Sequence, residues 1–223
     1  MYRVNGRVSI VPGDVMERLG ALSVPVIGDA MGRYGCMNYQ IKPLSDAFKV
    51  AGPALTVQTY RADNLMIHAA LEMAHEGDIL VVDACGFCDT GLWGSLMTRM
   101  AIARKLGGIV LDGAARDKLE VIELGFPVFC RGVSPMGGFK DSPGSVNVPV
   151  SCGGVPVSPG DVIVGDADGV VVVPSGRALE IAESARRTSD KEISFQKGIA
   201  EGKSLFDLLN LGESLEKLGI KKL

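Results

Sequence analysis

The chain has 223 residues and a formal net charge of -3 at pH 7, so it is long enough for one domain with a substantial core and has no basic field that would attract nucleic acid. Hydrophobic residues make up 47% of the chain, but they fall in runs far shorter than the roughly 20 apolar residues of a membrane helix. We therefore expect a soluble protein with neither nucleic acid nor membrane among its partners.

Helical patterns occur near the start of the chain, in its first half and at its end. Residues 12–22 begin with Pro and Asp and repeat apolar residues at helical spacing. Residues 1–20 lack the continuous apolar stretch of a secretion signal. Residues 62–75 show the same spacing, with Asp63 as the expected N-cap. Within this helix we expect Asn64 to be a capping or packing residue and His68 to be structural. From Ser175 on, alternating Lys, Glu and Arg predict one long helix, a break near Gly202 and a short helical tail.

The middle of the chain is typical of β structure. Short apolar runs bounded by Gly, Pro and Asp predict strands at residues 54–60, 78–83, 108–111, 128–131, 146–150, 161–164 and 170–173. Segments 77–86 and 160–169 share the pattern Gly-Asp, apolar run, Asp-Ala-x-Gly. We expect Asp161, Asp166 and Asp168 to satisfy turns there, since no ligand-bearing calcium loop follows them. Strands combined with helical ends indicate an α/β protein.

Several chemistries lack the residues they need. His68 and His75 are the only histidines and both fall in or beside a predicted helix, so a histidine-rich zinc site cannot form. The segment from Cys85 to Cys88 has redox spacing but no helix start after it, and we expect a plain turn. Five cysteines at no framework spacing favour reduced thiols and a cytoplasmic location. Nucleophile elbows, P-loops and dinucleotide-binding loops are absent from the sequence.

The strongest functional pattern is the pair Arg116-Asp117. It follows the apolar run 109–111, which we expect to break at a turn shaped by Asp112, and it precedes a helical pattern at 118–125. At such a strand-to-helix junction both side chains can face one cleft. The carboxylate suits a hydrated Mg²⁺, and the guanidinium suits a carboxylate or a developing enolate oxygen. The alternative is an N-cap joined to a surface ion pair.

A second pattern lies just upstream of this pair. A glycine-containing turn at 91–94 leads into an Ala-rich helix. The backbone N–H groups of Ser95 and Leu96 at the start of that helix would form a nest for an anion.

Taken together, these blocks resemble the RraA-like family, which includes the metal-dependent 4-hydroxy-4-methyl-2-oxoglutarate / 4-carboxy-4-hydroxy-2-oxoadipate aldolases. The resemblance spans nearly the whole chain, in family order, through ADNLMIHAAL, GDILVVDACG, the run from Gly94 to Asp117, GSVNVPVSCGG and GDVIVGDADGVVVVP. It implies one RraA-like swivelling β/β/α domain over residues 1–223, with a helical C-terminal segment from about residue 175. It also implies homotrimers or homohexamers with active sites between subunits.

The activity that this resemblance implies is that of a class II pyruvate aldolase, a lyase that cleaves 4-hydroxy-2-oxo di- or tricarboxylic acids to pyruvate and a second oxo acid. Oxaloacetate decarboxylation would be a side activity. By position, Asp117 would bind Mg²⁺ or Mn²⁺, Arg116 would hold the oxo-acid end and stabilise the enolate, and the amides of Gly94, Ser95 and Leu96 would receive the carboxylate. Glu192 matches a glutamate that a neighbouring subunit contributes to the site; its alternative is a solvated helix face.

One departure from the family pattern and one other function class bear on this interpretation. Ser95 stands where the aldolases carry an aspartate that orders metal-bound water, so we expect weaker metal binding or a different substrate. The family's namesakes are not catalytic: they bind and regulate ribonuclease E, and they lack the aspartate after the arginine. Because this chain keeps Asp117, the sequence favours an enzyme over a regulator of ribonuclease E or of another protein.

Overall fold

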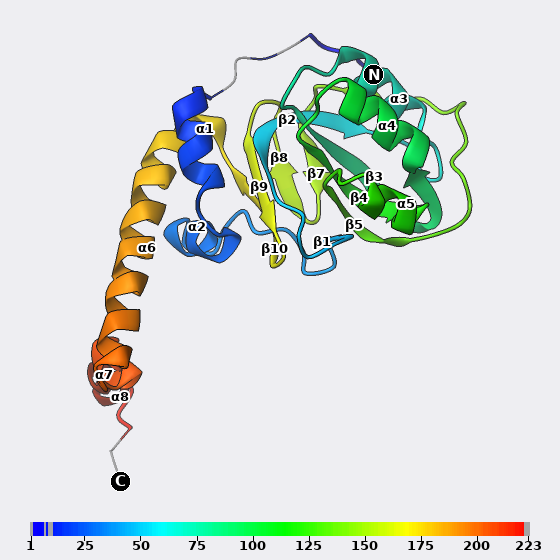
Figure 1. Cartoon of the computed structure of the whole chain (residues 1–223). Helices are drawn as coiled ribbons and strands as arrows, with labels where there is room; N and C mark the ends of the chain where they lie inside the picture. Colours follow the sequence, from blue (N-terminus) through cyan, green and yellow to red (C-terminus); the bar gives the residue numbers. More distant parts are fainter. Residues whose placement is uncertain (1, 7, 9–10, 221–223) are drawn as a thin grey trace.

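The computed structural model describes residues 2–6, 8 and 11–220. Its centre is a mixed sheet with strand order β1-β5-β4-β3-β2-β9-β10 (Figure 1). Four neighbouring strands are parallel: β2 (Val50–Gln58), β3 (Ile79–Trp93), β4 (Gly108–Ala115) and β5 (Val128–Val133). The helices that connect them are α3 (Leu65–Met73), α4 (Ser95–Ala103) and α5 (Lys118–Glu123). Because each crossover moves one strand along the sheet in the same direction, the three helices lie on the same face.

The remaining strands pair antiparallel or form a separate hairpin. A short strand, β1 (Lys42–Pro43), pairs with β5, and β6 (Ser145–Val146) pairs with β2. The sheet continues beyond β2 through a hairpin of β9 (Val162–Asp166) and β10 (Gly169–Val173). A second, two-stranded sheet is formed by β7 (Val150–Cys152) and β8 (Val155–Val157).

The main hydrophobic core fills the space around the parallel strands. Every residue of β4 is buried, as in a strand covered on both faces, and this explains its continuous apolar sequence. Helices α3, α4 and α5 bury Ile67, Ala101 and Val121 in this core, and the β7–β8 hairpin adds Cys152 and Val157.

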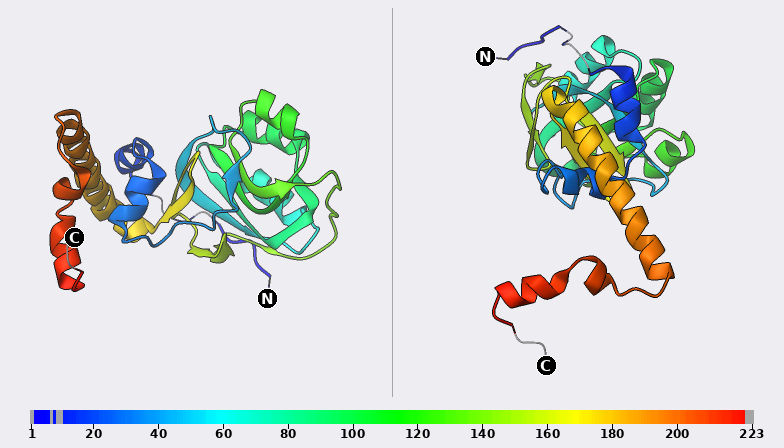
Figure 2. Two further views of the ribbon diagram at one scale, coloured as in Figure 1. Left: turned by 90° about the horizontal axis from the view of Figure 1, so that it is seen from below. Right: turned by 90° about the vertical axis from the view of Figure 1, so that its left-hand side faces the viewer.

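A second core lies at the β9–β10 end of the sheet. It joins these strands to α1 (Gly13–Gly20), α2 (Val24–Ala30) and the first half of α6 (Ala178–Ala200), which follows the short 3-10 helix η1 (Ser175–Arg177). The rest of α6 extends away from the sheet and carries α7 (Leu205–Leu208) and α8 (Leu211–Lys217) at its far end (Figure 2). In the described part of the chain, no helix is long and apolar enough to cross a membrane.

The α/β class with helices at both ends is confirmed, and so is the break after the long C-terminal helix. The predicted N-terminal helix ends at Gly20, and α2 was not predicted, because Pro25 and Gly28 interrupt its pattern. The predicted strand at 146–150 is two short strands, β6 and β7.

The segment from Cys85 to Cys88 corrects the prediction of a plain turn. It bends the backbone at Cys85 and Gly86, which both have positive φ, but the chain then continues as part of β3. Phe87 and Gly91 pair with β4 across shifts in register. The segment is therefore a bulged strand that carries the chain on to the glycines at 91 and 94.

Asp161 and Asp166, in the second of the two repeated segments, have the structural role that we expected. Asp161 accepts hydrogen bonds from the backbone N–H groups of Ser158 and Ser175, at 2.8 and 2.9 Å. Asp166 accepts from Val24 and Asp168, both at 2.9 Å. These carboxylates satisfy backbone donors at strand ends and tie the sheet to the helical ends of the chain.

Candidate active site

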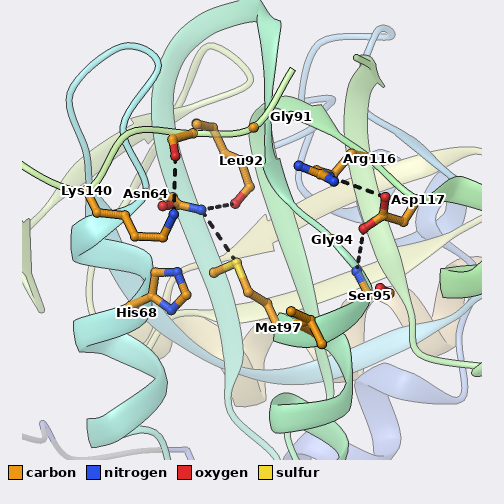
Figure 3. A pocket seen from close by; sticks show the side chains of 13 residues that line it. Asn64, His68, Gly91, Leu92, Gly94, Ser95, Met97, Arg116, Asp117 and Lys140 are labelled. Carbon is orange, nitrogen blue, oxygen red and sulfur yellow. Dashed lines mark hydrogen bonds and ion pairs between the residues drawn. The ribbon is translucent and has the colours of Figure 1, made fainter. Parts of the chain in front are cut away.

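A cavity of about 210 Å³ lies at the carboxyl ends of the parallel strands. Its walls come from the segments that follow β2, β3, β4 and β5, which is where α/β sheets bind ligands. The residues that line it are Asn64, His68, Gly91, Leu92, Gly94, Ser95, Leu96, Met97, Arg116, Asp117, Gly137, Gly138 and Lys140. The volume suits a small organic acid. Figure 3 shows two groups of polar side chains in it, one around Asp117 and one around Asn64.

Arg116 and Asp117 lie together in this cavity, as the sequence predicted. Nε of Arg116 donates a hydrogen bond to Oδ1 of Asp117 at 3.2 Å, and the backbone N–H of Ser95 donates to Oδ2 at 3.1 Å (Figure 3). The two side chains are 42% and 31% exposed. The carboxylate thus connects the start of α4 to the end of β4, while part of its surface still faces the cavity.

The backbone at Asp117 adopts a left-handed conformation, with φ 56° and ψ 36°, at the N-cap position of α5. Non-glycine residues rarely adopt this conformation, and aspartate is one of the few that tolerate it. The Ser95 backbone N–H, together with the neighbouring Arg116 guanidinium, lowers the pKa of Asp117 against a smaller opposing effect of burial. This group is therefore a carboxylate throughout the neutral range.

Glycines leave room for the arginine and the carboxylate. A Cβ at Gly94 would lie 2.6 Å from Oδ2 of Asp117, and a Cβ at Gly137 would lie 2.8 Å from Nη1 of Arg116. At Gly91 it would lie 2.6 Å from the carbonyl oxygen of Ser134. Any side chain at these positions would displace the polar groups, so the glycines are needed for close approach.

The second polar group consists of Asn64, His68 and Lys140, on the side of the cavity away from Asp117 (Figure 3). Asn64 is 6% exposed, and its side-chain N–H group donates to the Leu92 carbonyl oxygen at 3.0 Å. Among the described residues its Oδ1 is the one buried side-chain polar atom without a hydrogen-bond partner. Burial and the positive charge of Lys140 lower the pKa of His68, which favours the neutral imidazole. This wall offers an acceptor and a cation to a ligand.

The predicted anion nest is only partly available. The Ser95 backbone N–H already donates to Asp117. Leu96 is the second residue of α4, so its N–H has no intrahelical acceptor, as in any first turn. Leu96 lines the cavity and is 81% exposed. Gly94 holds the N-cap position. The three residues therefore border the cavity as expected, and the Leu96 N–H is a further candidate donor at the start of α4.

The structure corrects the prediction of a turn at Asp112. The strand does not break there: β4 continues to Ala115, and Asp112 is buried within it. Its Oδ1 accepts from Nε of Arg131, and its Oδ2 accepts from the backbone N–H of Gly153 at 2.7 Å. Asp112 thus joins β5 and the β7–β8 turn to the sheet, and it does not line the cavity.

Glu192 lies on the exposed part of α6, away from the cavity of its own chain. The described residues contain no group of three or more His, Cys, Asp or Glu placed to hold a metal ion together. A cation in the cavity would therefore be held by Asp117 with water and substrate oxygens. The carboxylate accepts hydrogen bonds from the Ser95 N–H and the Arg116 guanidinium, and the Ser95 hydroxyl adds a contact. A carboxylate has about four acceptor sites, so it retains acceptor capacity for a hydrated hard cation.

Sequence reasoning interpreted Asn64 as a cap or packing residue and His68 as structural, and it did not single out Lys140. Asn64 does hold the N-cap position of α3, but without a capping hydrogen bond from its side chain. The useful signal was position: Asn64 follows β2 and Lys140 follows β5, so parallel pairing brings both to the edge of the sheet that bears Arg116.

Comparison with known proteins agrees with this fold. The sequence profile of the RraA-like family, described as Aldolase/RraA, matches residues 24–172. A protein of Halalkalibacterium halodurans described as a candidate 4-hydroxy-4-methyl-2-oxoglutarate aldolase is 38% identical over 188 residues, which cover 84% of this chain and 90% of that protein.

Two crystal structures have the same fold. Streptomyces coelicolor RraAS2, described as an unusual member of the RNase ES inhibitor RraA family, is 35% identical with a TM-score of 0.74, over 84% of this chain and 98% of its own. An uncharacterized protein from Pseudomonas syringae pv. tomato is 27% identical with a TM-score of 0.80, over 90% of this chain and 99% of its own. The chain thus belongs to the RraA-like, Aldolase/RraA family.

Proposed function

We propose that this protein is a divalent-metal-dependent aldolase that cleaves 4-hydroxy-2-oxo di- or tricarboxylic acids to pyruvate and a second oxo acid. Oxaloacetate decarboxylation is its expected side activity, because both reactions pass through the enolate of pyruvate. The observation that carries the proposal is the pairing of Arg116 with Asp117 in a small cavity at the carboxyl ends of the strands. The relationship to a candidate aldolase at 38% identity supports it.

In this proposal Asp117 holds Mg²⁺ or Mn²⁺. The part of its carboxylate that faces the cavity has free lone pairs, and its lowered pKa keeps it charged. When bound, the ion supplies Lewis-acid polarisation of the 2-oxo group. Its single protein carboxylate leaves most coordination positions to water and substrate, as is common for Mg²⁺.

Arg116 stabilises negative charge on the three-carbon fragment. Its Nε is engaged by Asp117, and this contact orients the guanidinium. The remaining N–H groups are free to donate to the oxygen on which charge develops, where a fixed donor in a cavity has its largest effect. The Leu96 N–H at the start of α4 adds a donor for the carboxylate next to the oxo group.

The second polar wall suits the distal half of the substrate. Lys140 supplies a second cation, so the cavity has one positive group for each end of a dicarboxylate. Oδ1 of Asn64 lacks a partner and suits a hydroxyl donor such as the 4-hydroxyl group. Neutral His68 beside it adds a polar contact without a third positive charge.

We further propose that the site is completed in a homo-oligomer, a trimer or a hexamer. Leu65, Leu96 and Met100 are exposed beside the cavity, and the arm from α6 to α8 carries further exposed apolar residues away from its own sheet. Glu192, on that arm, would approach a neighbour's Asp117. Multi-angle light scattering gives the mass, and a monomer with full activity would contradict this part of the proposal.

Ser95 is expected to make the metal affinity modest. Its backbone N–H, and a contact from its hydroxyl, stabilise Asp117 without adding charge. A Ser95→Asp variant would place a second carboxylate beside the first, so we expect it to bind Mn²⁺ more tightly in calorimetric titrations. Equal or weaker binding by Ser95→Asp would show that this position does not set the affinity.

The direct test of the function is a panel of 4-hydroxy-2-oxo acids and oxaloacetate, assayed with Mg²⁺, with Mn²⁺ and with EDTA. Pyruvate is measured through lactate dehydrogenase and NADH oxidation. We expect release that depends on the metal and is abolished by EDTA. If none of these substrates gave metal-dependent pyruvate release, the aldolase proposal would be refuted.

A second candidate function is that of a non-catalytic regulator that binds ribonuclease E or another protein. The similarity to the inhibitor-family protein RraAS2, at 35% identity, favours it. The retained Asp117, charged and facing the cavity, argues for the enzyme instead. A binding assay with purified ribonuclease E, run beside the pyruvate assay, separates the two.

A further inference from the structure

We propose that Asp63, which does not line the cavity, is a positioning residue: its carboxylate fastens the segment that carries Lys140 to the helix that carries His68. Asp63 is 1% exposed. Its catalytic consequence rests on the proposed function, but its effect on the cavity wall does not.

The contacts of Asp63 reach both sides of the junction. Oδ1 accepts a hydrogen bond from the Leu65 backbone N–H at 2.8 Å, which fixes the first residue of α3. Oδ2 accepts from the backbone N–H groups of Asp141 and Ser142, at 2.8 and 3.0 Å. One buried carboxylate therefore satisfies three donors from segments almost eighty positions apart in the chain.

The two segments also meet along their backbones. Phe139 N–H donates to the Ala62 carbonyl at 2.8 Å, and Asn64 N–H donates to the Phe139 carbonyl at 2.9 Å. These bonds form a short parallel bridge between Asp63 and Phe139. The bridge sets the register, and the side chain of Asp63 holds the chain just after Lys140, where the bridge has ended.

The segment held in this way forms a large part of the cavity wall. It contains Gly137 and Gly138. A side chain at Gly137 would clash with Arg116, and a Cβ at Gly138 would lie 3.1 Å from Cγ of Asn64. Lys140 Nζ donates back to the Gly138 carbonyl at 3.3 Å. A shift of this segment would therefore change the position of a cation and of both close glycine contacts at once.

A charged oxygen acceptor suits this role better than a neutral one. Burial is the largest single effect and raises the pKa of Asp63. The backbone donors of Leu65, Asp141 and Ser142 together outweigh it, so the pKa is lowered. An asparagine has only one oxygen, and its N–H₂ group would face backbone N–H donors on one of the two sides. Asp63→Asn should thus release one segment while it preserves the size of the side chain.

The chain offers a matched control in Asp161, which also buries a carboxylate between backbone N–H donors, those of Ser158 and Ser175, but does not line or border the cavity. We compare wild type, Asp63→Asn and Asp161→Asn by thermal unfolding and by hydrogen exchange of peptides that cover residues 134–144. The affinity for oxalate in the presence of Mn²⁺ is measured by calorimetry, and KM and kcat for oxaloacetate are measured separately.

We expect faster exchange in the 134–144 peptides for Asp63→Asn alone, even where both variants lose similar thermal stability. We also expect KM to rise on the order of tenfold or more, the scale typical of residues that orient a site, with a smaller change in kcat. Unchanged exchange in Asp63→Asn, or an equal change in Asp161→Asn, would overturn the inference. If the wild type turned over no oxo acid, the aldolase proposal would fail, while the exchange data would still decide the role of Asp63.

Discussion

The sharpest prediction concerns Asp117→Asn. The change removes the charge but keeps an oxygen for the Ser95 N–H, and asparagine tolerates the left-handed backbone at this position, where alanine would be strained. Without the carboxylate the cavity loses the metal ligand that we propose, so we expect pyruvate release from oxaloacetate to fall on the order of a hundredfold or more. Calorimetry should show no saturable Mn²⁺ binding.

The fold should survive this change. Hydrogen bonds to charged groups contribute about 1.5–3 kcal/mol, but the side chain of Asp117 is 31% exposed and the variant retains one acceptor. We therefore expect the free energy of unfolding in urea to fall by about 1 kcal/mol.

Glu120→Gln is the matched control, because Glu120 lies on the same helix in an exposed ion pair with Arg99 at 2.9 Å and does not line the cavity. It should retain the wild-type rate and the wild-type Mn²⁺ affinity. Wild-type pyruvate release by Asp117→Asn, in the presence of Mg²⁺ and with an EDTA blank, would refute the assignment of the metal-binding group.

Three further outcomes follow from other contacts. Gly137→Ala should push the Arg116 guanidinium aside, because its Cβ would lie 2.8 Å from Nη1, and kcat/KM should fall about tenfold to a hundredfold with little loss of stability. Asp112→Asn should lower the free energy of unfolding in urea by roughly 3 kcal/mol without changing Mn²⁺ affinity, because the largely buried Arg131 cation loses its charged partner. The pKa of Asp117 is lowered in the folded protein. Its contribution to stability and to Mn²⁺ binding is therefore present above the ordinary Asp pKa of about 3.9 and is lost only as the pH falls through the lower folded pKa. Calorimetry at pH 5 and pH 7 should give the same Asp117-dependent affinity for Mn²⁺.

Each of these has its own control. Gly132→Ala adds a Cβ that meets no atom within 4 Å, so an equal loss of activity there would remove the steric explanation for Gly137. Glu180→Gln breaks an ion pair whose two side chains are more than half exposed and should leave the unfolding curve unchanged; an equally small effect of Asp112→Asn would argue against a buried pair. A midpoint for Mn²⁺ binding above pH 5 would assign the titration to another group.

The sequence alone located one half of the site. An apolar run followed by Arg116-Asp117 and by a helical pattern is local information, and a strand-to-helix junction can be recognised from neighbouring residues. The glycine-containing turn before Ser95 was local in the same way. The resemblance of several blocks to one family then fixed the fold class, which the structure and its relatives confirm.

The other half depended on which strands pair. Asn64 and Lys140 are seventy-six positions apart, and they share a cavity because β2 and β5 run parallel in one sheet. No local pattern encodes that neighbourhood, since the contacts that define it are long-range. The place of His68 could not be predicted for the same reason: its helix was predicted, but not the cavity that this helix borders.

Asp112 is a residue for which a local pattern predicted the wrong structure. An aspartate followed by glycine after an apolar run is a common turn signal, and the sequence by itself supports nothing more. Within the strand its burial is tolerated because Arg131 and the Gly153 N–H, which lie 19 and 41 positions away, satisfy its two oxygens. Residue types and local spacing thus determined the elements and the chemistry of Arg116-Asp117. Only the tertiary structure decided which charges face the cavity and which are neutralised in the core, because a buried charge is acceptable only where distant partners meet it.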